Sequence, residues 1–277
     1  MENEFYKGVR DSLQKKYRRS ITGKFNKALK TYKLVNEGDR VAVCVSGGKD
    51  SWLTAVLFKE LKRYSDVSFS VEYIVMDPGY AEENRRLIEE NAKLLDIPVK
   101  IFSTNIFNTV HEIPKSPCYL CARMRRGYLY NYAKELGCNK IALGHHYDDV
   151  IETTLMGLLY GAQMQGMMPK LHSTNFKGME LIRPLYLVRE DDIISWRDTN
   201  NLKFLRCACR FTENCEKDEN LSKRKEIKAL IRELKVKNPN VEKCIFGSLS
   251  NVNVDTVLVY KKDGEKHYFL DEYELKG

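Results

Sequence analysis

Short apolar runs alternate with segments of helical periodicity between residues 40 and 162 of this chain. The apolar runs are typical of buried strands, and they cover residues 41–45, 70–77, 99–103 and 140–144. The intervening segments repeat their apolar residues at the spacing of a helix. Strands separated by helices in this way usually form a parallel sheet that is covered on both faces. The pattern therefore predicts an α/β fold, with a mainly parallel sheet and helices on both faces.

The flanking parts of the chain have a different character. Residues 1–36 predict a basic helical N-terminal extension, and residues 37–200 form the α/β domain. Residues 201–277 predict a C-terminal segment with a Lys-rich helix from about Leu221 to Lys235. Its end predicts a hairpin, because Asp263-Gly264 lies between two runs of strand-forming residues.

Charge and hydropathy limit the compartment and the partners. The formal net charge of +8 favours a polyanionic partner such as nucleic acid, although solubility alone can require a surplus of this size. No stretch resembles a secretory signal or could span a membrane, so we expect a cytoplasmic protein with no membrane partner. Eight cysteines in a reducing compartment indicate metal or redox chemistry rather than disulfides.

A glycine-containing loop follows the first predicted strand directly. The loop consists of Ser46, Gly47, Gly48, Lys49, Asp50 and Ser51. Glycines allow backbone N–H groups to approach an anion, and the following helix presents its positive N-terminal end to it. Its spacing differs from that of the common P-loop. We predict that the loop cradles a pyrophosphate, with Lys49 neutralising charge and Asp50 holding Mg²⁺.

Two further segments end at the same predicted edge of the sheet. Asp77 ends the second strand and could contact a ribose or adenine, or serve only as a turn residue. Gly144, His145 and Asp149 belong to a turn after the fourth strand. Nucleotide sites in such sheets lie at the carboxyl ends of the strands. We therefore place these residues among the candidate nucleotide ligands, while Asp149 could equally cap the helix that follows.

The cysteines divide into two groups. Cys118 and Cys121 form a C-x-x-C, whose spacing lets both sulfurs reach one metal, and Cys207 and Cys209 follow far downstream. Four thiolates would hold structural zinc, whereas three could hold an iron–sulfur cluster with one open iron. The residues leave both possibilities open. The remaining thiols that we expect in the core are Cys44, Cys138 and Cys244.

Basic residues suggest where a nucleic acid would bind. Arginines follow the C-x-x-C at positions 123, 125 and 126, and the N-terminal helices carry Lys15, Arg18 and Arg19. Such residues bind phosphates in many proteins, but they also occur on helix faces that only contact solvent. We expect Arg123, Arg125, Arg126, Lys15, Arg18 and Arg19 to contact RNA.

In combination, the motifs resemble a known family. The series SGGKDS, CYLCARMRRG, GHHYDD and the later cysteine pair, in this order, resembles the tRNA 2-thiocytidine synthetases, which are ATP-dependent tRNA thiolases of the N-type ATP pyrophosphatase class. The similarity extends from about Tyr17 to Asn251. The resemblance implies that the loop binds the β and γ phosphates of ATP, and that ATP adenylates the C2 oxygen of a cytidine in the anticodon loop before sulfur replaces it.

The resemblance also implies a cofactor and partners. A [4Fe-4S] cluster would be held by Cys118, Cys121 and Cys207, and would carry the sulfur. Where the family commonly has a second C-x-x-C, this chain has Cys207-Ala208-Cys209, so Cys209 is the alternative third ligand. The expected partners are tRNA and a sulfur donor such as a cysteine desulfurase or free sulfide, and the sequence allows a homodimer. The catalytic residues would be Lys49, Asp50 and the cluster cysteines.

Other functions are compatible with the same motifs. A related enzyme could act on a uridine of tRNA, or could remove sulfur rather than insert it, since the pocket and not the phosphate loop reads the base. A non-enzymatic iron–sulfur protein could bind RNA and sense oxygen, but it would have no need of a pyrophosphate cradle. A zinc protein with amide-forming or lysidine-type ligase activity would show no visible absorption.

Overall fold

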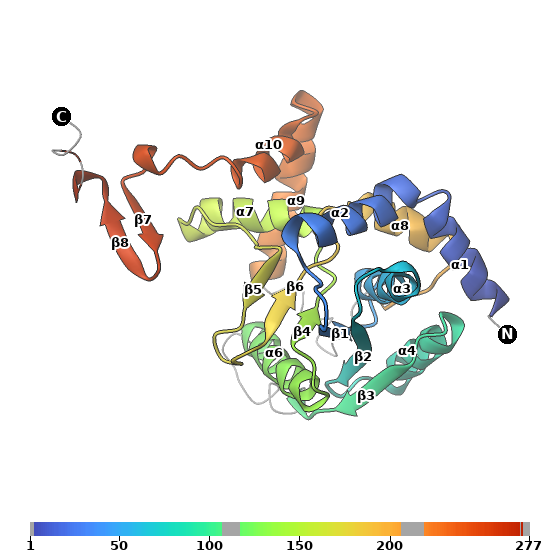
Figure 1. Cartoon of the computed structure of the whole chain (residues 1–277). Helices are drawn as coiled ribbons and strands as arrows, with labels where there is room; N and C mark the ends of the chain where they lie inside the picture. Colours follow the sequence, from blue (N-terminus) through green and yellow to red (C-terminus); the bar gives the residue numbers. More distant parts are fainter. Residues whose placement is uncertain (1–2, 107–116, 206–218, 272, 274–277) are drawn as a thin grey trace.

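The structure is a computed structural model that describes residues 3–106, 117–205, 219–271 and 273, with the backbone alone for 117–119, 121–122 and 219–222. Its centre is a six-stranded sheet (Figure 1). The strand order is β3 (Val99–Ser103), β2 (Ser70–Asp77), β1 (Arg40–Cys44), β4 (Lys140–Ala142), β6 (Glu180–Ile182) and β5 (Lys170–His172). All neighbours are parallel except β5 and β6. The predicted α/β class with a mainly parallel sheet is therefore confirmed.

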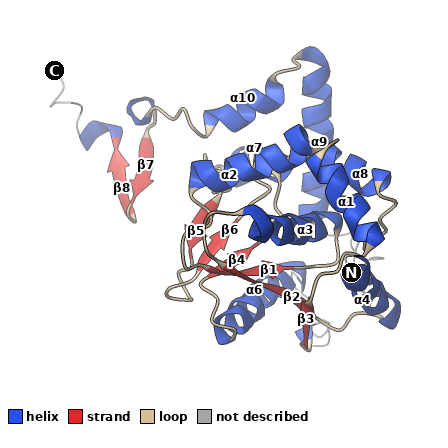
Figure 2. Ribbon diagram, turned by 45° about the vertical axis from the view of Figure 1, so that its right-hand side comes forward, coloured by secondary structure: helices blue, strands red, loops and turns tan. Residues whose placement is uncertain are grey.

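Helices cover both faces of the sheet, as Figure 2 shows. On one face lie α3 (Lys49–Tyr64), α4 (Glu82–Leu94) and α8 (Glu190–Thr199), and on the other lies α6 (Pro117–Glu135). The side chains of β1 alternate between the two cores. Val41 and Val43 belong to the core that includes α3, whereas Ala42 packs in the core that includes α6. The strand reads as a continuous apolar run because both of its faces are buried.

The basic N-terminal helices pack on the α3 face of the sheet. They are α1 (Glu4–Gln14), the π-helical turn η1 (Arg18–Thr22) and α2 (Gly23–Tyr32). Their apolar side chains recur at helical spacing and are buried, and their charged residues lie on the opposite side of each helix. The buried set is Tyr6, Val9, Leu13, Tyr17, Ile21, Phe25 and Ala28. Residues 4–32 thus contribute to the same core as α3 and β1.

The C-terminal part joins the sheet through α7 (Tyr147–Gly161), which follows β4. Packed against α7 are α9 (Glu219–Lys237) and α10 (Val241–Ser248), with Ile151, Ile227 and Ile231 in a small core of their own. Cys44 and Cys138 are buried as expected, but the expectation that Cys244 lies in the core is wrong. The structure places Cys244 on α10, where it is exposed to solvent.

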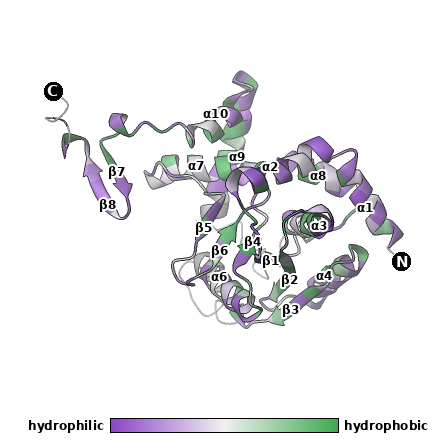
Figure 3. Ribbon diagram, in the orientation of Figure 1, coloured by the Kyte–Doolittle hydropathy of each residue, from purple (hydrophilic) through white to green (hydrophobic). Residues whose placement is uncertain are grey.

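The predicted hairpin is present at the end of the chain. It consists of β7 (Val259–Lys262) and β8 (Glu265–Tyr268), between the short 3₁₀ turns η3 (Val254–Thr256) and η4 (Phe269–Asp271). Asp263 and Gly264 both have positive φ, as a tight two-residue turn of this kind requires. The hairpin projects away from the sheet (Figure 1), and its β8 strand is hydrophilic, in contrast to β4 and β6 in Figure 3.

The strand order identifies the edge where a ligand is expected. The chain passes from β1 to β2 on one side, and β4 lies on the other side of β1. In open α/β sheets a crevice forms where the order reverses in this way, outside the carboxyl ends of the strands. The loops that follow β1 and β4 meet at this point. None of the described helices combines the length and apolar character that crossing a membrane requires.

Candidate active site

The loop between β1 and α3 forms a closed turn at the N-terminus of the helix. The backbone N–H of Ser46 donates to Ser51 Oγ at 3.1 Å, and Ser51 Oγ donates to the Gly48 carbonyl at 2.8 Å. Gly47 has a φ of 88°, and a Cβ at this position would lie 2.6 Å from the Leu205 side chain. Only glycine fits there. The N–H groups at the start of a sixteen-residue helix then face the loop, which is the arrangement that binds phosphate.

Lys49 is held between two carboxylates. Its Nζ lies 3.1 Å from the Asp50 carboxylate and 3.1 Å from Glu190 Oε1. Although burial opposes it, the charges of Asp50 and Glu190 raise the pKa of Lys49, so the ammonium remains charged at neutral pH. Glu190 is the first residue of α8 and lies 141 positions from Lys49. This residue was not predicted to join the site, although the acidic run that it begins, residues 190–192, is visible in the sequence.

The turn after β4 approaches the loop of residues 46–51 closely. A Cβ on Gly144 would lie 2.9 Å from the carbonyl carbon and oxygen of Asp50, so glycine permits this approach. Asp149 Oδ2 accepts a hydrogen bond of 3.0 Å from the His146 backbone N–H. Asp149 therefore caps α7, which is one of the two roles predicted for it, the other being a nucleotide ligand. The structure therefore brings the two candidate turns together.

His145 and Asp149 differ in charge. Burial is the main cause that lowers the pKa of His145 to about 4, so its imidazole is neutral at pH 7. Its buried Nδ1 makes no hydrogen bond within the described part of the chain. Burial tends to raise the pKa of Asp149, but the charge of His146 and the hydrogen bond from its backbone outweigh burial and lower this pKa, so Asp149 stays ionised. A neutral imidazole with an unused nitrogen can hydrogen-bond to a ligand.

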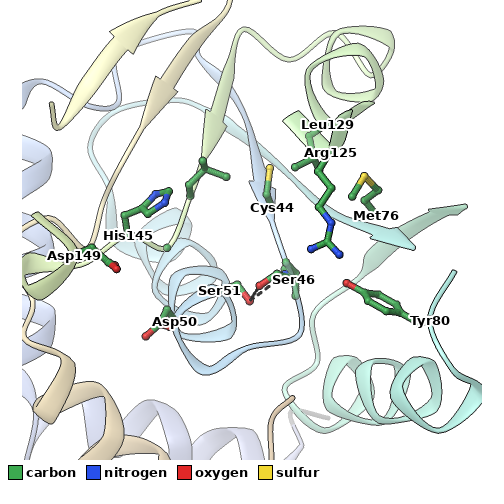
Figure 4. Close-up of a pocket in the computed structure, with 13 residues that line it drawn as sticks. Cys44, Ser46, Asp50, Ser51, Met76, Tyr80, Arg125, Leu129, His145 and Asp149 are labelled. Atoms are coloured by element: carbon green, nitrogen blue, oxygen red, sulfur yellow. Dashed lines mark hydrogen bonds between the residues drawn. The ribbon is translucent and has the colours of Figure 1, made fainter. Parts of the chain in front are cut away.

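A cavity of about 310 Å³ opens between these turns and α6. A volume of this order is typical of a small-molecule site. Figure 4 shows the Arg125 guanidinium reaching from α6 toward Ser46 and Tyr80, with His145 and Asp149 on the opposite side. The lining residues are Cys44, Val45, Ser46, Asp50, Ser51, Met76, Tyr80, Arg125, Leu129, Leu143, Gly144, His145 and Asp149. Polar groups from β1, α3 and the β4 turn thus converge on one space.

Asp77 lies at the end of β2, where its carboxylate organises the following turn. Its Oδ1 accepts from the backbone N–H groups of Gly79 and Tyr80, at 2.8 and 2.7 Å. Its Oδ2 accepts from Arg85 at 3.1 Å. These contacts correspond to the turn alternative. A nucleotide contact by Asp77 stays a prediction.

The basic residues expected to bind RNA lie on two faces. Arg123 and Arg126 are exposed on α6, and Arg125 lines the cavity. The exposed residues Lys15, Arg18 and Arg19 belong to the N-terminal helices, on the α3 face of the sheet. The structure thus separates the two groups, and the α6 group adjoins the cavity.

The cluster cysteines are only partly covered by the structure. Cys118 and Cys121 lie in the first turns of α6, three positions apart, which places them on the same side of the helix. Cys207 and Cys209 lie outside the described residues. Within the residues that the structure covers, no three His, Cys, Asp or Glu side chains are grouped as a metal site would require. The backbone of α6 is compatible with two ligands to one metal group.

Replacement of Gly144 by Ala is expected to lower the free energy of unfolding by about 1–3 kcal/mol, the usual effect of overpacking. The added Cβ would press on the Asp50 backbone and push the β4 turn away from the loop of residues 46–51. Urea denaturation measures the effect. The matched control is Gly247→Ala in α10, where a Cβ meets nothing within 4 Å and stability should not fall. Equal stability of the two variants would contradict the close approach.

The sheet order, with the glycine-containing loop of residues 46–51 after β1, places the protein in the PP-loop class. In agreement with this, residues 17–216 match the family model described as a PP-loop domain. The tRNA-cytidine(32) 2-sulfurtransferase of Syntrophotalea carbinolica is 35% identical over 247 residues, which are 88% of this chain and 92% of the relative. The enzyme of the same name from Coxiella burnetii is 38% identical over 245 residues, or 86% and 92% of the two chains.

The chain belongs to the tRNA-cytidine(32) 2-sulfurtransferase family of PP-loop proteins. The fold is also similar to a solved structure, the U34-tRNA thiolase NcsA from Methanococcus maripaludis with its [4Fe-4S] cluster. The TM-score is 0.65 at 22% identity, and the match covers 83% of this chain and 77% of the other. This likeness concerns the fold.

Proposed function

We propose that the protein is an ATP-dependent tRNA thiolase that converts a cytidine of the anticodon loop to 2-thiocytidine. The observation that carries this proposal is the match to 2-sulfurtransferases over most of both chains, together with a phosphate loop whose side chains line a cavity. The name of these relatives supports cytidine 32 as the target. Adenylation and sulfur transfer would occur in sequence at the C2 position of the base.

In the first step, the C2 oxygen of the cytosine attacks the α-phosphorus of ATP, and the bond to pyrophosphate breaks. The loop N–H groups and the Lys49 ammonium would bind the departing pyrophosphate and stabilise its negative charge. Asp50 would hold Mg²⁺ against the phosphates. The site fits this ion, because Mg²⁺ usually takes one or two carboxylates and completes its shell with phosphate oxygens and water, and the Asp50 carboxylate lies at the cavity wall.

In the second step, sulfur replaces the oxygen at C2, and AMP leaves with that oxygen. Cys118, Cys121 and Cys207 would hold a [4Fe-4S] cluster, which would supply the sulfur from an iron without a protein ligand. Cys209 is the alternative to Cys207. The neutral His145 would orient the base or nucleotide through its unused nitrogen. Free sulfide would restore the sulfur directly, and a cysteine desulfurase would restore it as persulfide sulfur together with a two-electron reductant such as a thiol pair.

Mass spectrometry of tRNA nucleosides from a strain that lacks the gene tests the proposal. We expect 2-thiocytidine to disappear and to return when the wild-type gene is restored. Unchanged 2-thiocytidine would contradict the proposal. Loss of a thiolated uridine instead would support the uridine enzyme.

The arginines of α6 are expected to bind tRNA phosphates. Replacement of Arg123 and Arg126 by Ala should weaken binding and reduce the slope of log affinity against log salt by about 0.7–0.9 for each phosphate that the variant no longer neutralises. Binding titrations at several salt concentrations measure the slope. The control removes the same charge elsewhere, with Arg86→Ala and Lys93→Ala on the exposed side of α4. If both double variants keep the wild-type slope, Arg123 and Arg126 contact only solvent.

A further inference from the structure

A chain of ion pairs connects the phosphate loop to the C-terminal helix α9. Glu190 lies between two lysines, with Oε1 at 3.1 Å from Lys49 Nζ and Oε2 at 2.9 Å from Lys228 Nζ. Lys228 also lies 3.5 Å from Glu152, which is almost fully buried on α7. Although burial opposes it, the hydrogen bond from Lys228 and the charge of Lys49 lower the pKa of Glu190 to about 2. Glu190 is therefore ionised at any working pH.

This arrangement creates an electrostatic requirement when a nucleotide binds. Lys49 is already paired with Glu190, so its ammonium must turn toward the phosphates in order to neutralise them. The carboxylate of Glu190 would then lose one of the two lysines paired with it while negative phosphates arrive beside it. The negative charges of a carboxylate and of neighbouring phosphates repel each other strongly in a partly buried site. Something must keep Glu190 neutralised.

We propose that Lys228 is the counter-ion of Glu190 that allows Lys49 to pass from this carboxylate to the nucleotide phosphates. The inference rests on the proposed function, because it requires ATP in the loop. Lys228 is a positioning residue, since it acts on Lys49 and the phosphates through Glu190. Its own side chain is 34% exposed, and Glu190 is 24% exposed, so both groups are partly shielded from solvent. Their interaction is therefore screened less than that of a surface pair.

A simpler role for Lys228 would be to attach α9 to α7 and α8. In that case, loss of the ammonium would lower stability but leave nucleotide affinity unchanged. The counter-ion role makes a different prediction. Removal of Lys228 should weaken nucleotide binding, and removal of the Glu190 charge in the same protein should restore it, because residue 190 would then carry no negative charge beside the phosphates.

The test measures binding of an ATP analogue with a methylene between its α and β phosphates, in the presence of Mg²⁺, to the full chain by calorimetry. Lys228→Met is expected to raise Kd about tenfold, as for the loss of one charge-assisted interaction. Lys228→Gln should act in the same direction, and Lys228→Arg should bind as the wild type does. The matched control is Lys225→Met, an exposed position on the same helix, which should leave Kd unchanged.

The double variant Glu190→Gln/Lys228→Met decides between the two roles. We expect its Kd to return to within about threefold of the wild type, a non-additive result typical of groups in direct contact. Wild-type affinity in the Lys228→Met and Lys228→Gln variants, or no recovery in the double variant, would overturn the counter-ion role. Failure of the wild-type protein itself to bind the analogue would instead contradict the proposed function.

Discussion

Replacement of Asp50 by Ala is expected to abolish tRNA-dependent AMP formation, with a fall in turnover of at least about 100-fold. A loss of this size is typical when a group that stabilises developing charge is removed. Asp50 is the second residue of α3, beside Lys49 and at the wall of the cavity, where its carboxylate can reach a phosphate-bound Mg²⁺. The measurement is release of AMP and pyrophosphate from ATP in the presence of tRNA.

The control for this variant is Asp66→Ala, because Asp66 is exposed in the loop between α3 and β2, away from the cavity. That variant should retain wild-type turnover. Lys49→Ala should depress turnover in the same way as Asp50→Ala, through loss of charge neutralisation at the departing pyrophosphate. Stopped thiolation with undiminished AMP release from the Asp50→Ala protein would remove Asp50 from the adenylation step.

Replacement of Cys118, Cys121 or Cys207 by Ala is expected to abolish both the cluster and thiolation. Three thiolates can hold a cubane cluster with one iron open, whereas structural zinc uses four protein ligands and leaves no position for sulfur. Wild-type protein purified without oxygen should be brown and carry about four irons per chain. Iron and sulfide analysis, with the visible absorption spectrum, measures the loss in each variant.

Two other cysteines serve as controls in the same experiment. Cys209→Ala should retain the cluster and at least part of the activity, because a fourth protein ligand would block the open iron. Cys244→Ala should behave as the wild type, since Cys244 is exposed on α10. One tightly held zinc that needs all four motif cysteines would refute the cluster mechanism. An essential Cys209 with a dispensable Cys207 would change only the third ligand.

Local patterns were sufficient to predict the strands and helices that surround the site. Strand β2 and the loop of residues 46–51 consist of adjacent residues, so their apolar runs and glycines could be read directly from the sequence. The strands β5 and β6 were not predicted, because three residues are too few to show a period of two. Their pairing with each other and with β4 decides their conformation.

The position of the loop of residues 46–51 at the carboxyl end of a strand follows from the sequence alone. That Glu190 and Lys228 join this loop follows only from the fold. Lys49 and Glu190 are 141 positions apart, and Glu190 and Lys228 are 38 positions apart, so these pairs meet through helix packing and not through local spacing. The N-terminal helices illustrate the same division. Their charges and periodicity were visible in the sequence, but packing on α3 makes their apolar faces part of the core. Contacts between distant segments depend on how whole elements pack, and a local pattern does not contain that information.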